Sequence, residues 1–178
     1  NQVPKERLLE FIGTIGIPAT AEQFFVKKKF VIDISATAPV KISFISINFE
    51  EFFLVGKGKI EEPITKKTLC FQKLLRSSSD TLIIDELGGE GEAETTLTEL
   101  YALMVLQSNG EDGALLTNGC ANIFYVGDDF SGVLRAVYVY WIGGVWHVYT
   151  SPVVDPLGWD DGIRVFSRNS ESFESLAS

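Results

Sequence analysis

The residues with the clearest capacity for chemistry are the only histidine, His147, and two pairs of adjacent carboxylates. The pairs are Asp128-Asp129 in the loop GDDFSG and Asp160-Asp161 in the loop PLGWDDG. A histidine can exchange protons near neutral pH, and paired carboxylates can bind a divalent cation or act as acid and base. One hypothesis is therefore a hydrolase-like enzyme that uses His147 with Asp128, Asp129 or Asp160.

The spacing of these residues gives that chemistry no specific support. A lone histidine is a poor basis for a zinc or haem site, and the calcium-loop, nucleophile-elbow and phosphate-loop motifs are all absent from the sequence. Aspartate beside glycine is typical of turns, which is our preferred interpretation of both pairs. We predict no metal, no cofactor and no catalytic residue. We expect solvated side chains for Glu61, Glu62, Glu86, Glu90, Glu92 and Glu94.

His147 belongs to an aromatic stretch, VYVYWIGGVWHVYT, which spans residues 137–150. Gly143-Gly144 in its centre predicts a two-residue hairpin turn, because such turns need positive φ, which glycine adopts without a steric penalty. A turn of this length fixes the register of the two strands. The predicted pairs are Ile142 with Val145, Trp141 with Trp146, Tyr140 with His147, Val139 with Val148, and Tyr138 with Tyr149.

Side chains alternate between the two faces of a strand, so the register also sorts the hairpin into two surfaces. We predict a core face made of Val137, Val139, Trp141, Trp146 and Val148. The outward face would carry Tyr138, Tyr140, Ile142, Val145, His147 and Tyr149, and Trp159 and Ile163 could extend it. Tyrosine is favoured at recognition surfaces because it gives a large contact area at a low entropic cost. The alternative is that a second layer, such as the 97–107 helix, covers the tyrosine face.

The clearest helix in the sequence is predicted at about 96–107, and we expect it to be the one long helix of the fold. Thr96 and Glu99 form a capping-box pattern, and the apolar residues that follow have helical spacing. The helix is apolar nearly all round, which predicts that it is buried against a sheet.

The other segments are predicted mainly from apolar periodicity and turn residues. We expect a short helix at 5–12, strands at 24–34, 41–49, 68–75 and 81–87, a loop at 88–94, and a meander in which 122–126 pairs with 133–141. The apolar phase slips between Phe44 and Ile45, which a β-bulge or burial on both faces would explain. The fold class is then α+β, with a mostly antiparallel sheet, in one domain over 1–170 and a flexible tail at 171–178.

Composition limits the classes of protein that fit. The chain has 178 residues and a net charge of −9, and a charge of that sign disfavours a general nucleic-acid partner. Apolar runs are too short to cross a membrane, and the first twenty residues make a poor signal peptide because Glu6 and Glu10 interrupt them. We interpret Cys70 and Cys120 as ordinary thiols, although a disulfide between them stays open.

Six phrases of the sequence resemble a family of uncharacterised proteins that occur in several copies per genome in ultrasmall candidate-phylum bacteria. They are KISF, GKIEEPI, AETTLTELYALM, LLTNGCANIFYV, GVLRAV and WDDGIRVFSRNS, and the match runs from about Ile17 to Ser170. The family has no assigned activity, so the resemblance carries over no functional residue. Its members look alike in these phrases and differ at the outward hairpin positions. The resemblance therefore implies a diversified contact face, of the kind that a retroelement generates in a C-terminal variable region.

The sequence thus favours a non-enzymatic recognition module that presents an aromatic face to a protein, peptide or glycan ligand. The hydrolase described above is one alternative. A structural subunit of a phage or cell-surface assembly is the other.

Overall fold

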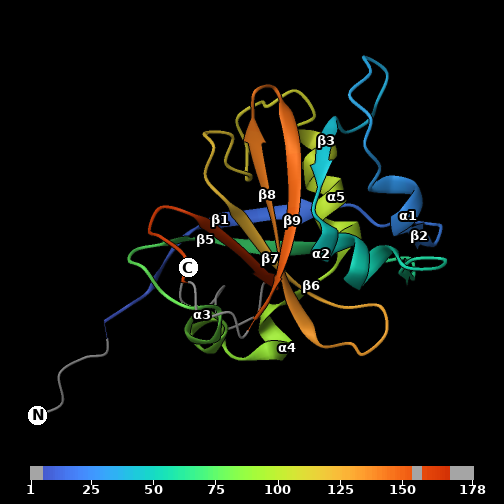
Figure 1. Cartoon of the computed structure of the whole chain (residues 1–178). Coiled ribbons are helices and arrows are strands. Elements are labelled where there is room, and N and C mark those ends of the chain that lie inside the picture. Colours follow the sequence, from blue (N-terminus) through green and yellow to red (C-terminus); the bar gives the residue numbers. More distant parts are fainter. Residues whose placement is uncertain (1–5, 154–157, 169–178) are drawn as a thin grey trace, which may run out of the picture.

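A computed structural model describes residues 6–153 and 158–168. It is an α+β fold around an eight-stranded sheet with the strand order β1-β5-β10-β7-β8-β9-β3, and β6 pairs with β7 beside this path (Figure 1). The sheet strands are β1 (Leu9–Ile17), β3 (Ile42–Ile45), β5 (Lys67–Leu74), β6 (Glu94–Thr95), β7 (Asn122–Gly127), β8 (Leu134–Ile142), β9 (Val145–Pro152) and β10 (Arg164–Arg168). A separate two-stranded sheet joins β2 (Phe24–Phe25) to β4 (Ile60–Glu61).

The sheet is mixed, which corrects the expected mostly antiparallel sheet. The β7–β8–β9 meander is antiparallel as predicted, and β5 pairs antiparallel with β1 and β10. Three further pairs are parallel, namely β10 with β7, β6 with β7, and β3 with β9. Parallel neighbours need long crossover connections, and apolar alternation within a strand does not encode which distant strand will lie beside it.

Helical structure is spread over several short segments. The predicted helix at 96–107 is α5 (Leu97–Leu106), and both hydrogen bonds of its Thr96–Glu99 capping box are present. At ten residues α5 is shorter than the one long helix that we expected. The other helices in the described part of the chain are α1 (Val26–Lys29), α2 (Ile47–Phe49), the π-helix η1 (Glu50–Leu54), α3 (Asp80–Leu87) and α4 (Glu90–Ala93).

Five local predictions are wrong, and one of them is the strand at 41–49, whose last three residues form helix α2. The segment at 81–87 is helix α3, whose first turn is capped by the Ser79 hydroxyl and whose last residue precedes Gly88, both of which are helix-boundary signals. The segment at 5–12 enters strand β1, because pairing with β5 outweighs its weak helical pattern. The segment at 24–34 holds only β2 and α1, and the expected loop at 88–94 contains α4. The expected flexible tail lies outside the described residues.

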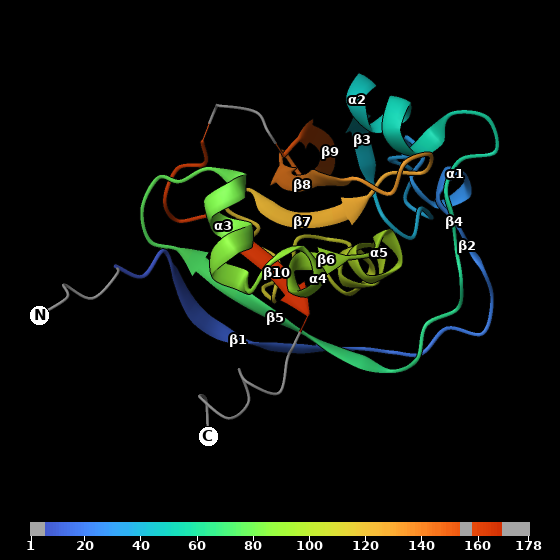
Figure 2. The same ribbon diagram turned by 90° about the horizontal axis from the view of Figure 1, so that it is seen from below.

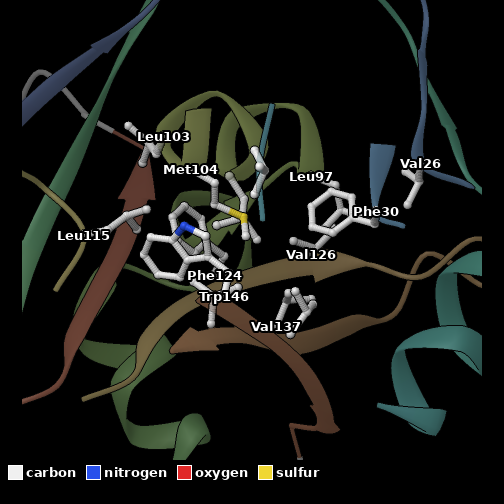
Figure 3. Close-up of a cluster of buried hydrophobic side chains, with 14 of the residues drawn as sticks. Val26, Phe30, Leu97, Leu103, Met104, Leu115, Phe124, Val126, Val137 and Trp146 are labelled. Atoms are coloured by element: carbon white, nitrogen blue, oxygen red, sulfur yellow. The ribbon is translucent and has the colours of Figure 1, made fainter. Parts of the chain in front are cut away.

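Helix α5 fills the concave side of the sheet. Figure 2 shows it between the β1–β5 pair and the β7–β8 pair, and all seven strands of the main path contribute buried side chains around it. Leu97 and Met104 of α5 lie in the same cluster as Phe124 and Trp146 (Figure 3). The prediction that α5 is buried against a sheet is therefore confirmed, and the helix lies on the Trp146 side of the hairpin.

The convex side of the sheet has a second core beneath α3. Ile83, Ile84 and Leu87 of α3 pack with Ile123 and Tyr125 of β7. Within the described residues, no helix has the length and apolar composition needed to cross a bilayer.

Two glutamates that we expected in solvent instead fix the ends of elements. Glu61 is buried and accepts hydrogen bonds from the Leu97 and Thr98 amides at 3.0 and 2.7 Å, where the N-terminus of α5 favours a negative charge. Glu86 of α3 accepts from the Leu9 amide at 2.6 Å, at the start of β1. Each carboxylate accepts hydrogen bonds from backbone N–H groups that have no partner within their own helix or strand.

Candidate functional site

The predicted hairpin is present with the predicted register. Gly143 and Gly144 have φ values of +63° and +82°, so both adopt the conformation that a primed two-residue turn requires. All five predicted cross-strand pairs, from Ile142 with Val145 to Tyr138 with Tyr149, are formed. The two faces of the hairpin are therefore the two sets that alternation predicts.

The core face packs against α5. Trp146 is fully buried, and Trp141 is half-buried at its edge, with the two indole centroids 5.2 Å apart. The loop after α5 passes directly over Trp141 at Gly110. A Cβ atom at Gly110 would lie 2.4 Å from the Trp141 ring, so only glycine fits there. We expected Trp141 to be core, but its side chain is only partly buried.

The outward face is a set of mutually contacting aromatic rings. Tyr138 and Tyr149 stack across the hairpin with centroids 5.5 Å apart and planes 9° from parallel. Tyr140 stands at 87° to Tyr138 and 84° to Tyr149, with centroid distances of 5.8 and 5.6 Å. At these distances the rings touch, so a ligand would lie over their exposed edges.

Trp159 joins this set from the loop before β10, as predicted. Its ring centroid is 4.7 Å from that of Tyr138, at an interplanar angle of 79°. Two backbone hydrogen bonds, of 3.0 and 2.7 Å, pair it with Ser78, and its indole N–H donates to the buried Asp80 carboxylate at 2.7 Å. Tyr125 donates to the same oxygen. Trp159 is therefore held in place by the second core beneath α3.

Phe44 is a member of the face that sequence reasoning missed. The register of β3 against β9 shifts between Ile42 and Phe44, which places both Ser43 and Phe44 opposite His147. A bulge is therefore present in β3, slightly before the predicted position between Phe44 and Ile45. The Phe44 ring lies 5.2 Å from Tyr149 and 6.3 Å from His147. The slip therefore turns Phe44 outward, and it was the signal that could have identified this residue.

The outward side chains are less exposed than predicted. Tyr138, Tyr140, His147 and Tyr149 are half-buried rather than largely exposed, because the rings cover one another and Trp159 covers one end. Ile142 is 49% exposed, whereas Ile163 is buried in the second core and cannot extend the face. The aromatic face is defined here as Phe44, Tyr138, Tyr140, Ile142, Val145, His147, Tyr149 and Trp159.

Asp128 does not face His147 but belongs to a separate network in its own loop. Asp128 is buried, and its carboxylate accepts hydrogen bonds from Ser131, Gly132 and Arg135, the last at 2.9 Å. Burial by itself would raise the pKa of Asp128, but these hydrogen bonds outweigh burial and hold the pKa below its ordinary value. Arg135, which binds Asp128, and Tyr140, which pairs with His147, are five residues apart on β8. At the rise per residue of a strand, the backbones of Arg135 and Tyr140 are therefore roughly 17 Å apart.

The other three aspartates of the two pairs are open to solvent. Asp129, Asp160 and Asp161 are exposed, and no cluster of three metal-ligating side chains occurs among the described residues. Burial, followed by the nearby ionisable groups of Tyr138, Tyr149 and Cys120, raises the pKa of Tyr140 to about 12. The Tyr140 hydroxyl is therefore neutral at physiological pH and can both donate and accept a hydrogen bond.

The closest polar contact of His147 is with Ser43. The Ser43 hydroxyl and His147 Nε2 are 3.4 Å apart, and the histidine tautomer decides which atom donates. Both cysteines are thiols, with Cys70 buried and Cys120 half-buried.

Comparisons with protein-family models, curated proteins and solved structures give no match to this chain.

Proposed function

We propose that the protein is a non-enzymatic recognition module whose contact surface is the aromatic face. The observation that carries the proposal is the gathering of aromatic rings from β3, β8, β9 and the 158–162 loop on one side of a hairpin whose other side is core. Such a surface offers aromatic contact area with hydroxyl and imidazole groups among the rings, which suits a protein, peptide or glycan ligand.

The rings are also preorganised for contact. Stacking within the face, together with the hydrogen bonds that hold Trp159, restricts the rotamers before any ligand arrives. A ligand then gains contact area without the full entropic cost of ordering these side chains.

The position of the face on strands suits a diversified surface, which the family resemblance implies. Side chains alternate along β8 and β9, so outward positions can change while Val139, Trp146 and Val148 keep their contacts with the core. The fold would tolerate variation at the contact positions for this reason.

Binding to arrays of glycans and displayed peptides tests the proposal. We expect at least one ligand class to bind, and Tyr149→Ser and Phe44→Ser each to weaken that binding about tenfold or more, the effect of losing an aromatic contact residue. Phe130→Ser is the matched control, because Phe130 is 70% exposed in the loop between β7 and β8, away from the face. Binding that survives both face substitutions, or that falls equally in the control, would place the contact surface elsewhere.

The Ser43–His147 contact favours a second candidate, a hydrolase with Ser43 as nucleophile. Such a pair needs a carboxylate to orient the histidine, and Asp128 is committed to Arg135 and its own loop. Labelling by a fluorophosphonate probe that disappears in Ser43→Ala would support the hydrolase.

The third candidate is a structural subunit of an assembly. It predicts an oligomer that buries the aromatic face, and this oligomer should dissociate in solution when Tyr149 or Phe44 is substituted.

A further inference from the structure

A basic surface lies at one end of this otherwise acidic protein. Residues 26–32 contain three lysines and no carboxylate, and residues 55–60 contain two lysines and no carboxylate. Lys27, Lys28, Lys29 and Lys57 are exposed. Lys59 is half-buried and is neutralised by Glu61, 3.2 Å away, so four exposed cations define the basic end.

Direct contacts join the two segments into one surface. The Lys27 ammonium donates to the Gly56 carbonyl at 2.7 Å, and the Val26 amide donates to the Lys59 carbonyl at 3.1 Å. Beneath them, β2 pairs with β4. The lysines of α1 and of the 55–58 turn are therefore neighbours in space, although about thirty residues of sequence separate them.

Exposed aliphatic side chains stand among these lysines. Ile32 is 63% exposed directly after α1, and Val55 is 67% exposed at the start of the turn. Val31 and Ile60 are exposed to a smaller extent. Single exposed aliphatic residues are common on protein surfaces, and these four are distinguished by their place in the two lysine-rich segments.

The opposite end of the molecule is acidic. Residues 80–94, which include α3, α4 and the first residue of β6, contain six carboxylates and no lysine or arginine, and all of these carboxylates except that of Asp80 lie at least partly exposed. Figures 1 and 2 both place α1, β2 and α2 on the side of the molecule away from α3. The protein therefore carries a charge asymmetry that would turn the basic end toward an anionic surface and the acidic end away from it.

We infer that the basic end docks on the surface of an anionic lipid bilayer. Lysines at the headgroup level attract anionic lipids, while Ile32 and Val55 enter the interfacial region. Aliphatic groups among the lysines fit a bilayer better than a nucleic acid, which calls for aromatic or hydrogen-bonding groups that contact bases. Asp33, Glu50 and Glu51 are exposed near this end, and Glu22 and Glu62 are exposed beside the β2–β4 pair. The attraction therefore comes from the local lysine cluster and not from a net positive surface, and it is modest and sensitive to salt.

Co-sedimentation of the full chain with vesicles tests the inference. We expect binding to phosphatidylcholine vesicles that contain phosphatidylglycerol, weaker binding in high salt, and none to phosphatidylcholine alone. Lys28→Glu combined with Lys57→Glu should weaken binding at least about tenfold, because each lysine near the membrane contributes substantially to the attraction. Ile32→Ser combined with Val55→Ser should weaken it several-fold while the charge is unchanged.

Two substitutions elsewhere serve as matched controls. Lys73→Glu changes an exposed lysine on β5, and Leu82→Ser changes a leucine of α3 that is 51% exposed. Both should bind as the unchanged protein does, and thermal melting should show that every variant is folded. Failure to bind the anionic vesicles, equal binding to neutral ones, or equal losses in the controls would overturn the inference. Lysine-dependent binding to duplex DNA or RNA in place of vesicles would also overturn it.

Discussion

Tyr138 and Tyr149 face each other across the β8–β9 hairpin with their rings stacked 5.5 Å apart and 9° from parallel. One residue nearer the Gly143-Gly144 turn on each strand, Val139 and Val148 form a pair on the opposite side, in the core beneath α5. A single pairing register therefore organises both the aromatic face and the wall of the main core. Substitutions on the two sides should have different consequences.

Trp146→Ala should destabilise the protein by about 3 to 5 kcal/mol, because it removes the largest fully buried side chain of the core. Tyr149→Ser should cost less, roughly 1 to 2 kcal/mol, because the half-buried ring loses stacking but leaves a surface that water can reach. Urea unfolding of the two variants measures both values. Equal losses would mean that both sides of the hairpin act as core.

Gly110→Ala should destabilise the protein by about 1 to 3 kcal/mol more than Gly119→Ala. Both glycines have positive φ, so both variants share the backbone strain. Only at Gly110 would the new Cβ collide with Trp141, whereas nothing lies within 4 Å of the corresponding atom at Gly119. Thermal or denaturant unfolding of the pair isolates the collision, and identical losses would show that Trp141 moves aside freely.

Asp128→Asn should destabilise the protein at neutral pH by about 1 to 3 kcal/mol, because it weakens the charged hydrogen bonds to Arg135 and the loop. The folded-state pKa of Asp128 is depressed, so its contribution is complete above the unfolded-state pKa of ~3.9 and is lost as the pH falls through the lower folded value. The difference between the two proteins should therefore shrink in acid. Asp129→Asn, at an exposed neighbour, is the control and should change little at any pH.

Tyr140 should ionise near pH 12, and Tyr140→Phe should remove that step from an absorbance titration of the tyrosines. The folded state keeps this proton more tightly than the unfolded chain does. Its stabilising effect is therefore complete below about pH 10 and is lost as the pH rises through about 12. If Tyr140→Phe instead removes a step near pH 10, the ordinary value for tyrosine, water reaches this hydroxyl freely.

The hairpin register and helix α5 were predictable because short-range geometry determines both. Gly143-Gly144 fixes which residues pair, and strand alternation then assigns each side chain to a face. Thr96 and Glu99 mark the start of α5 by a hydrogen-bond exchange within one turn. Neither prediction needs a distant part of the chain.

The start of β1 and helix α3 were misassigned because their local signals are weak or shared by both kinds of element. The apolar run at 81–87 fits a buried strand or a short helix, and its boundary residues, Ser79 and Gly88, decide between them. At 5–12 the decisive interaction is pairing with β5, more than fifty residues away in the sequence. Local pattern cannot report that partner.

The tertiary structure alone decided which side chains complete the aromatic face. The sequence determined that Tyr138, Tyr140, His147 and Tyr149 share one side of a hairpin. The β3 bulge then brought Phe44 beside them, and the fold docked Trp159 on Asp80 while it buried Ile163. Alternation depends only on the backbone geometry of neighbouring residues. Contacts between segments depend on how the whole chain fills two cores at once, which no single stretch of sequence contains.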